Sequence, residues 1–206
     1  MSLYRNVTSR PWLTPGLHPD AHARPAFEKP NEKVALSFFI AVATAVFSLL
    51  IVSSLMRMTM SNDWVSLDLP SLLWLNTGAL VISSIAFQMA TSYARRGYSL
   101  SGLRWRFITG GVLAIAFIAG QYVVWQQLHA AGYGLATNPA NDFFYLFTGL
   151  HVIHLLGGLW VWSKTLLTLT RAKGTEEARL NIELCTTYWH FLLLVWLVLF
   201  YFLAAN

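Results

Sequence analysis

Five long apolar runs constrain the fold of this chain more than any other feature of its sequence. They cover approximately residues 34–56, 71–94, 107–129, 143–163 and 182–204. An α-helix needs about 20 apolar residues to cross the ~30 Å hydrocarbon core of a bilayer, and each run is long enough. Charged residues make up only 11% of the chain, against about 25% in soluble domains. The sequence therefore predicts an all-α integral membrane protein with five transmembrane helices.

The positions of the basic residues predict how these helices are oriented. Lys and Arg are concentrated in residues 1–33, 95–106 and 164–179, whereas the first connection has only Arg57 and residues 130–142 have none. Cytoplasmic loops of membrane proteins carry the excess of Lys and Arg. We therefore expect the N-terminus inside and the C-terminus outside. The net charge of +5 then follows from topology, and we expect no nucleic-acid partner.

The chain divides by composition into residues 1–32 and residues 33–206. The first part has no apolar run and holds five of the seven prolines, so we expect a proline-rich cytoplasmic tail rather than a signal peptide. The connections between the apolar runs are too short for an extramembrane catalytic domain. We therefore expect the five-helix bundle to act within the bilayer or by contact with a partner protein.

The fourth run contains the segment TGLHVIHLLGG, residues 148–158. In a helix, one stripe of this run carries Thr148, His151, His154, Leu155, Gly158 and Trp162, with Gly157 beside it. Small residues let a second backbone approach closely, and hydroxyl or imidazole groups can hydrogen-bond across such a contact. This stripe is therefore predicted to be a helix–helix interface.

The fifth run places a further histidine, His190, about 14 Å from the inner surface at ~1.5 Å per residue. His154 falls at a similar depth when residues are counted back from Lys164, so His154 and His190 could face each other. One interpretation is a metal or bis-histidine haem site, which needs an axial histidine on each of two facing helices. The other is that each imidazole is neutral and hydrogen-bonded. The second is favoured because the nearest carboxylate, Glu183, should lie much closer to the inner surface.

Other polar residues in the apolar runs are predicted to bond between helices. They are Asn76, Thr77, Ser83, Ser84, Gln88 and Gln121. Neutral polar groups of this kind commonly hydrogen-bond across membrane helices, while Gly110 and Gly111 would permit close packing. The single cysteine, Cys185, excludes an internal disulfide and is expected to be an inert buried thiol.

Several motifs together resemble a known family. In chain order they are LNTGALVISS, ARRG, AGQYVVWQQL, TGLHVIHLLGG and YWHFLLLVW. This order resembles subunit III of the haem–copper terminal oxidases, the cytochrome c oxidase and quinol oxidase family, in its five-helix bacterial form. The resemblance runs from about residue 33 to the C-terminus. It implies a subunit of the bacterial plasma membrane that packs beside subunit I, in a complex with subunit II.

The same resemblance implies a structural role without catalytic or metal-binding residues. The haems and copper would be held by the partner subunits, while this chain would bind phospholipid in a cleft and support proton uptake. The residues implied to shape the bundle and its lipid cleft are His151, His154, Gly157, Gly158, Glu183, Trp189 and His190. Arg95 and Arg96 are expected to attract anionic headgroups at the inner surface.

Three positions depart from the family pattern. Ala43, Val124 and Leu193 stand where the family often has an intramembrane carboxylate. Their loss argues against a role of this chain in carrying protons itself. Two alternatives remain open at this point: an accessory subunit of a nitric oxide reductase, and a self-contained bis-histidine membrane cytochrome b.

Overall fold

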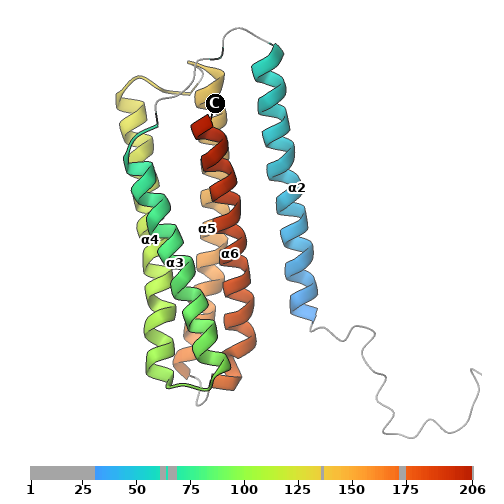
Figure 1. Cartoon of the computed structure of the whole chain (residues 1–206), viewed down its shortest axis with the longest axis vertical. Coiled ribbons are helices and arrows are strands. Elements are labelled where there is room, and N and C mark those ends of the chain that lie inside the picture. Colours follow the sequence, from blue (N-terminus) through green and yellow to red (C-terminus); the bar gives the residue numbers. More distant parts are fainter. Residues whose placement is uncertain (1–30, 61–63, 65–68, 136, 172–174, 206) are drawn as a thin grey trace, which may run out of the picture. The chain divides into compact units, whose positions relative to one another are not determined.

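A computed structural model describes residues 31–60, 64, 69–135, 137–171 and 175–205. These residues form the helices α2 (Asn31–Met60), α3 (Leu72–Arg95), α4 (Leu100–Ala130), α5 (Pro139–Arg171) and α6 (Thr175–Ala205) (Figure 1). Five helices are long and apolar enough to cross a membrane, so the predicted fold class is confirmed. The chain divides into two units, Met1–Ala35 and Leu36–Asn206. Most of the expected tail, residues 1–30, lies outside the described residues.

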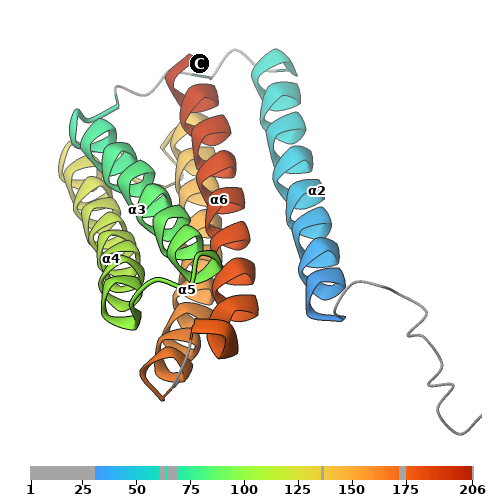
Figure 2. The same cartoon turned by 60° about the horizontal axis from the view of Figure 1, so that its bottom comes forward.

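Helices α3 to α6 pack together in the second unit. α3 lies between α4 and α6, and α5 also contacts both α4 and α6 (Figures 1 and 2). The core between them is built from large side chains with almost no exposed surface, including Phe87, Phe107, Phe117, Trp189 and Trp196. Because lipid tails are as apolar as these side chains, close packing and interhelical hydrogen bonds must hold the helices together.

The part of α2 that belongs to the second unit contacts α5 and α6 through few side chains. Phe47 of α2 packs with Phe147 of α5 and with Val195 and Leu199 of α6 in a small separate cluster. Only 11% of the apolar window of α2 is buried, compared with 33–44% in the other helices. α2 is therefore the helix with the most surface left for lipid or a partner.

Glycines end α3 and α4 in the same way. Gly97 and Gly132 have φ angles of +65° and +89°, a region that glycine enters without steric penalty. After each, the next N–H bonds back five residues, from Tyr98 to Tyr93 and from Tyr133 to Leu128. This is the Schellman arrangement, which satisfies the last carbonyl groups of a helix.

The start of α5 differs from a simple reading of the apolar run. Asn138 Oδ1 accepts from the Ala140 N–H at 3.1 Å, and Pro139 is the first helical residue. Proline suits this position because its missing N–H would have no helical partner. Asn141 and Asp142, by contrast, lie inside the first turn of α5.

Two glycines of α4 admit bulky side chains from neighbouring helices. A Cβ at Gly111 would lie 2.1 Å from Cε2 of Trp162, and one at Gly110 would lie 2.9 Å from the ring of Phe87. Both distances are far below the separation of about 3.5–4.0 Å between carbon atoms in normal contact. The prediction that Gly110 and Gly111 permit close packing is therefore confirmed.

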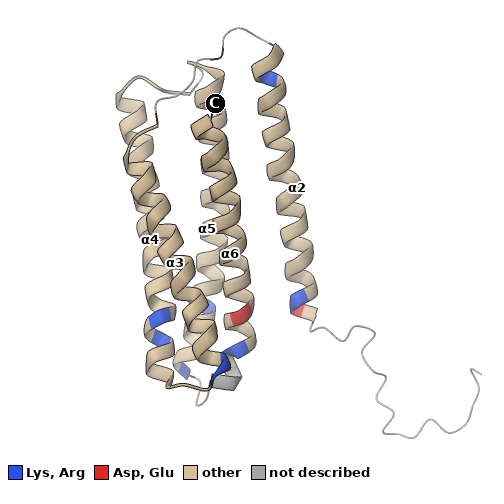
Figure 3. Cartoon of the chain, viewed as in Figure 1, with Lys and Arg blue, Asp and Glu red and all other residues tan. Residues whose placement is uncertain are grey.

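The basic residues of α3 to α6 lie at one end of the helices (Figure 3). α4 begins at Leu100 and so contains Arg104 and Arg106, and α5 continues past Lys164 to Arg171. These helices are longer than their apolar runs because they include the basic residues at the ends of the runs. Long basic side chains allow this, since they can reach the polar membrane surface from a helical backbone. Arg57 lies in the last turn of α2.

Candidate functional site

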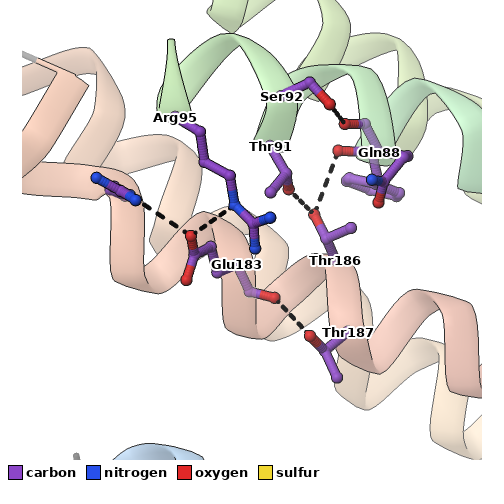
Figure 4. Close-up of polar contacts among 9 residues, drawn as sticks. Gln88, Thr91, Ser92, Arg95, Glu183, Thr186 and Thr187 are labelled. Carbon is purple, nitrogen blue, oxygen red and sulfur yellow. Dashed lines mark hydrogen bonds and ion pairs between the residues drawn. The ribbon is translucent and has the colours of Figure 1, made fainter. Parts of the chain in front are cut away.

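A series of polar contacts joins α3 to α6 along their length. At the basic end, Nε of Arg95 lies 2.9 Å from Oε1 of Glu183 (Figure 4). About one turn further, Oγ1 of Thr91 donates to Oγ1 of Thr186 at 2.7 Å, and Thr186 donates to the Phe87 carbonyl at 3.3 Å. Near the other end, Nε1 of Trp196 donates to Oγ1 of Thr77 at 3.0 Å.

His190 lies in the middle of this series of contacts and bonds to two residues of α3. Its Nε2 is 2.9 Å from Oε1 of Gln88, and its Nδ1 bonds with the hydroxyl of Ser84. A carbonyl oxygen only accepts, so Nε2 carries the proton and Nδ1 accepts from Ser84. Both imidazole nitrogens are therefore used within the chain. The predicted interhelical role of Ser84 and Gln88 is confirmed.

His154 lies on the side of α5 that faces α2. Its Nδ1 donates to the Leu150 carbonyl of its own helix at 2.8 Å. Its ring is 5.3 Å from that of Phe47 and 6.1 Å from that of Phe39, measured between centroids. The hydroxyl of Tyr188 donates to the backbone carbonyl of His154 at 3.0 Å. His154 therefore helps to seat α2 and α6 against α5.

His151 is enclosed in the bundle core with 0% of its surface exposed. Its ring lies 5.1 Å from that of Trp196 and 6.0 Å from that of Phe117. Neither ring nitrogen has a hydrogen-bond partner among the described residues. Gln121 is equally buried, and neither its oxygen nor its nitrogen is paired. The prediction that Gln121 bonds across helices is therefore wrong for this structure.

The histidines thus occupy three separate environments. His190 contacts α3, His154 contacts α2, and His151 lies among aromatic rings of α4 and α6. His154 and His190 do not face each other, although they could at equal depth, because depth does not fix the direction in which a side chain points. No group of three His, Cys, Asp or Glu residues suited to a metal occurs in the described part of the chain.

The predicted interface stripe of α5 is confirmed. Thr148, His151, Leu155 and Gly158 are buried, and His154 and Trp162 are partly buried. A Cβ at Gly158 would lie 3.1 Å from the ring of Tyr188 and 3.4 Å from that of Trp189. Trp189 in turn stacks on Phe87 with 5.1 Å between ring centroids. Gly158 therefore sets the close approach of α5 and α6.

Gly157 points the other way, toward an apolar pocket. No atom lies within 4 Å of a Cβ built on Gly157. The pocket has a volume of about 390 Å³ and is lined by Leu36, Phe39, Gly157, Trp160, Val161, Leu184 and Tyr188 of α2, α5 and α6. Nζ of Lys164 lies 3.6 Å from the ring centroid of Trp160 and so provides a cation close to this pocket.

Most arginines at the basic end of α3 to α6 form hydrogen bonds, ion pairs or ring contacts within the chain. Arg95 and Arg179 both pair with Glu183. Arg104 donates to the Leu169 and Thr170 carbonyls at the C-terminal end of α5. The guanidinium of Arg106 lies 3.6 Å from the ring centroid of Tyr93. Arg96 is exposed.

The three positions without a carboxylate are filled by packed apolar side chains. Ala43 and Val124 are buried, and Leu193 packs at the edge of the core. On α6, Glu183 lies seven residues before His190 and is already held by two arginines. Among the residues that the structure describes, these helices show no row of intramembrane carboxylates.

Sequence reasoning missed two kinds of contact. One is the α2 aromatic pair, Phe39 and Phe47, against His154. The other is the packing of the Trp162 ring against Gly111, with Nε1 of Trp162 donating to the Phe107 carbonyl at 2.9 Å. The adjacent glycines of α4 and the tryptophan on the α5 stripe were visible signals, but their pairing needs the helix arrangement.

Comparison with known proteins assigns the chain to a family. The family model of cytochrome c oxidase subunit III matches residues 34–205. A probable cytochrome c oxidase subunit 3 of Nocardia farcinica is 32% identical over 124 residues, 60% of this chain and 61% of that relative. A cytochrome c oxidase subunit 3 of Synechocystis is 29% identical over 167 residues, 79% of this chain and 70% of the relative. That of Thermostichus vulcanus is 27% identical over 184 residues, 85% of this chain and 88% of the relative.

The match to the first of these relatives spans about three fifths of its length, and the family model covers the five-helix part of this chain. The matched range, residues 34–205, contains the three histidines and the residues of α3, α5 and α6 that they contact. The chain is a multi-pass membrane protein and belongs to the cytochrome c oxidase subunit III family.

Proposed function

We propose that this chain is a non-catalytic structural subunit of a proton-pumping terminal oxidase. It packs beside the haem–copper subunit I, in a complex with subunit II, in a bacterial plasma membrane. The observation that carries the proposal is the family match over residues 34–205, together with relatives named as cytochrome c oxidase subunit 3. The haems and copper belong to the partner subunits.

The use of the histidines supports a structural role. His190 uses both ring nitrogens in contacts with Ser84 and Gln88, and Nδ1 of His154 donates to the Leu150 carbonyl. A haem ligand needs a free nitrogen directed at the iron, and His190 has none. The contacts instead hold α2, α3, α5 and α6 in register. The chain supports proton uptake indirectly, by stabilising its partner and the surrounding lipid.

The direction of the helices in the membrane belongs to the same proposal. The basic end of α3 to α6 faces the cytoplasm, in accordance with the excess of Lys and Arg on that side of membrane proteins (Figure 3). Residues 1–32 then form a cytoplasmic tail before the bundle of residues 33–206, and the C-terminus lies outside.

Phospholipid binding is proposed at the apolar pocket beside Gly157. Its lining suits an acyl chain, and Lys164 stands close to the pocket at the basic end of α5. A basic side chain near the membrane surface attracts an anionic headgroup. Arg96, which is exposed, is suited to bind a second headgroup.

Purification of the tagged chain from native membranes tests the main proposal. We expect it to bring down a larger haem-containing protein, with oxygen consumption by the complex, while the separated chain shows no Soret absorption. If the chain came down without any haem protein, the proposal would be wrong. A separated chain with a Soret band would instead support the self-contained cytochrome, and reduction of nitric oxide in place of oxygen would support the reductase accessory subunit.

A pair of glycine substitutions tests the lipid pocket. Gly157→Leu fills the pocket and should reduce the phospholipid that remains after mild detergent washing, as measured by mass spectrometry. Gly149→Leu is the matched control, because it adds the same side chain to α5 at another glycine with open space around its Cβ. Equal retention in both variants would show that this pocket does not hold lipid.

A further inference from the structure

The exposed surface formed by α3 and α6 has one polar patch in an otherwise apolar region. Gln88 and His190 are both exposed. The large exposed side chains around them are apolar: Ile85, Met89, Leu194 and Leu197. His190 is the middle residue of α6, which spans Thr175–Ala205. The patch therefore lies near the centre of the bilayer rather than at its surface.

The hydrogen bonds of this patch end in donors that have no partner among the described residues. Ser84 donates to Nδ1 of His190, and Nε2 of His190 donates to Oε1 of Gln88. The carboxamide oxygen of Gln88 is thus used inside the chain. Its Nε2 group carries two further N–H donors, and these have no hydrogen-bond partner among the described residues.

Lipid cannot accept these hydrogen bonds. The ester and phosphate oxygens of a phospholipid lie about 15 Å from the bilayer centre, and the acyl chains between them have no acceptor. A polar group left unpaired in hydrocarbon is unfavourable. Protein side chains on a neighbouring membrane helix can supply the missing acceptor.

The surface next to the patch is apolar and open to a second helix. A groove of about 400 Å³ begins at His190 and continues along α6 past Leu193, Leu194, Leu197, Val198 and Tyr201. Its apolar lining would contact side chains of a second helix, while Gln88, which is bonded to His190 at the polar end of the groove, would fix the register.

We propose that the α3–α6 face at Gln88 and His190 is the docking surface for one transmembrane helix of the haem-bearing partner subunit. That helix carries a hydrogen-bond acceptor, such as a hydroxyl, amide or carboxylate oxygen, at mid-membrane opposite Gln88. The choice of the haem-bearing subunit rests on the proposed function, whereas the position of the interface rests on the hydrogen bonds and the groove.

Site-specific photocrosslinking in the intact complex tests the position of the interface. A benzoylphenylalanine replaces Leu194, which lines the groove and is 60% exposed, or Val112 of α4, which is 54% exposed and serves as the control. We expect the probe at Leu194, and not the probe at Val112, to form a covalent product with the haem-bearing subunit.

Other results would overturn the inference in distinguishable ways. Crosslinking to the haem-bearing subunit only from Val112 would refute the docking surface and leave the proposed function intact. Crosslinking of Leu194 to a second copy of the chain would show self-association instead. Absence of any haem-bearing protein from the purified complex would refute the proposed function and, with it, the identity of the partner.

A substitution of the donor itself provides a second measurement. Gln88→Met keeps a side chain of similar length but removes the unpaired N–H groups and also the oxygen that accepts from His190. Met89→Leu is a control at the neighbouring exposed position. Interhelical hydrogen bonds in membranes correspond to about a threefold to tenfold change in an association constant. We expect detergent to dissociate the Gln88→Met chain from the complex more readily by that factor, and an unchanged dissociation curve would contradict the proposal.

Discussion

Gly111→Ala should destabilise the bundle strongly, because α4 has no room for a methyl group at this position. The added Cβ would lie 2.1 Å from Cε2, 2.3 Å from Cζ2 and 2.6 Å from Nε1 of Trp162. Normal carbon contacts are about 3.5–4.0 Å, so the indole would have to move by more than ~1 Å. It cannot do so freely, since Nε1 of Trp162 donates to the Phe107 carbonyl at 2.9 Å.

The expected magnitude follows from these two effects. Overpacking of a filled core destabilises by about 1–3 kcal/mol, and the loss of one hydrogen bond adds about 1 kcal/mol. Together they give about 2–4 kcal/mol. In a chain of this size each kcal/mol lowers the midpoint of thermal unfolding by about 2–4 °C.

Gly78→Ala is the matched control. Gly78 lies inside α3, and no atom lies within 4 Å of a Cβ built on it. Replacing a helical glycine with alanine at such a site stabilises by about 0.5–1 kcal/mol. The assay is the unfolding midpoint of the purified chain in one detergent. Equal midpoints for the two variants would refute the idea that Trp162 fills the space above Gly111.

Three further variants test the polar contacts by the same unfolding midpoint. His151→Phe should change stability by less than about 1 kcal/mol or raise it, since the buried imidazole has no hydrogen bond to lose. His190→Phe should destabilise by about 1–3 kcal/mol because it leaves the buried hydroxyl of Ser84 without its partner. Glu183→Ala should have a small effect of less than ~1 kcal/mol that disappears at high salt, since its partner Arg95 is 57% exposed. The reverse order for His151 and His190 would contradict the assigned environments.

Hydropathy located the helices but not their ends. The third apolar run covers residues 107–129, whereas α4 begins at Leu100. The extra turns contain Arg104 and Arg106, which a hydropathy pattern assigns to a loop. In the structure these side chains cap α5 and cover Tyr93. Apolar length reports the thickness of the hydrocarbon core, while helices continue into the polar surface where local hydrogen bonds support them.

Periodicity predicted which side of α5 is buried, because the small and polar residues of its stripe recur at helical spacing. It could not predict which helix each side chain meets. His151 and His154 are less than one turn apart, yet one contacts Trp196 of α6 and the other contacts Phe47 of α2. That difference depends on the rotation of each neighbouring helix, which has no signal in a single sequence.

The polar residues of the bundle differ in what they leave for other molecules. Thr77, Thr91 and Thr186 close their hydrogen bonds inside the chain. Gln88 is different, because its oxygen is used by His190 while its exposed side chain has no partner for the nitrogen among the described residues. In a bilayer such a donor has a partner only if another protein covers it. The polar contacts that hold α3 against α6 therefore also indicate where a neighbouring protein binds this subunit.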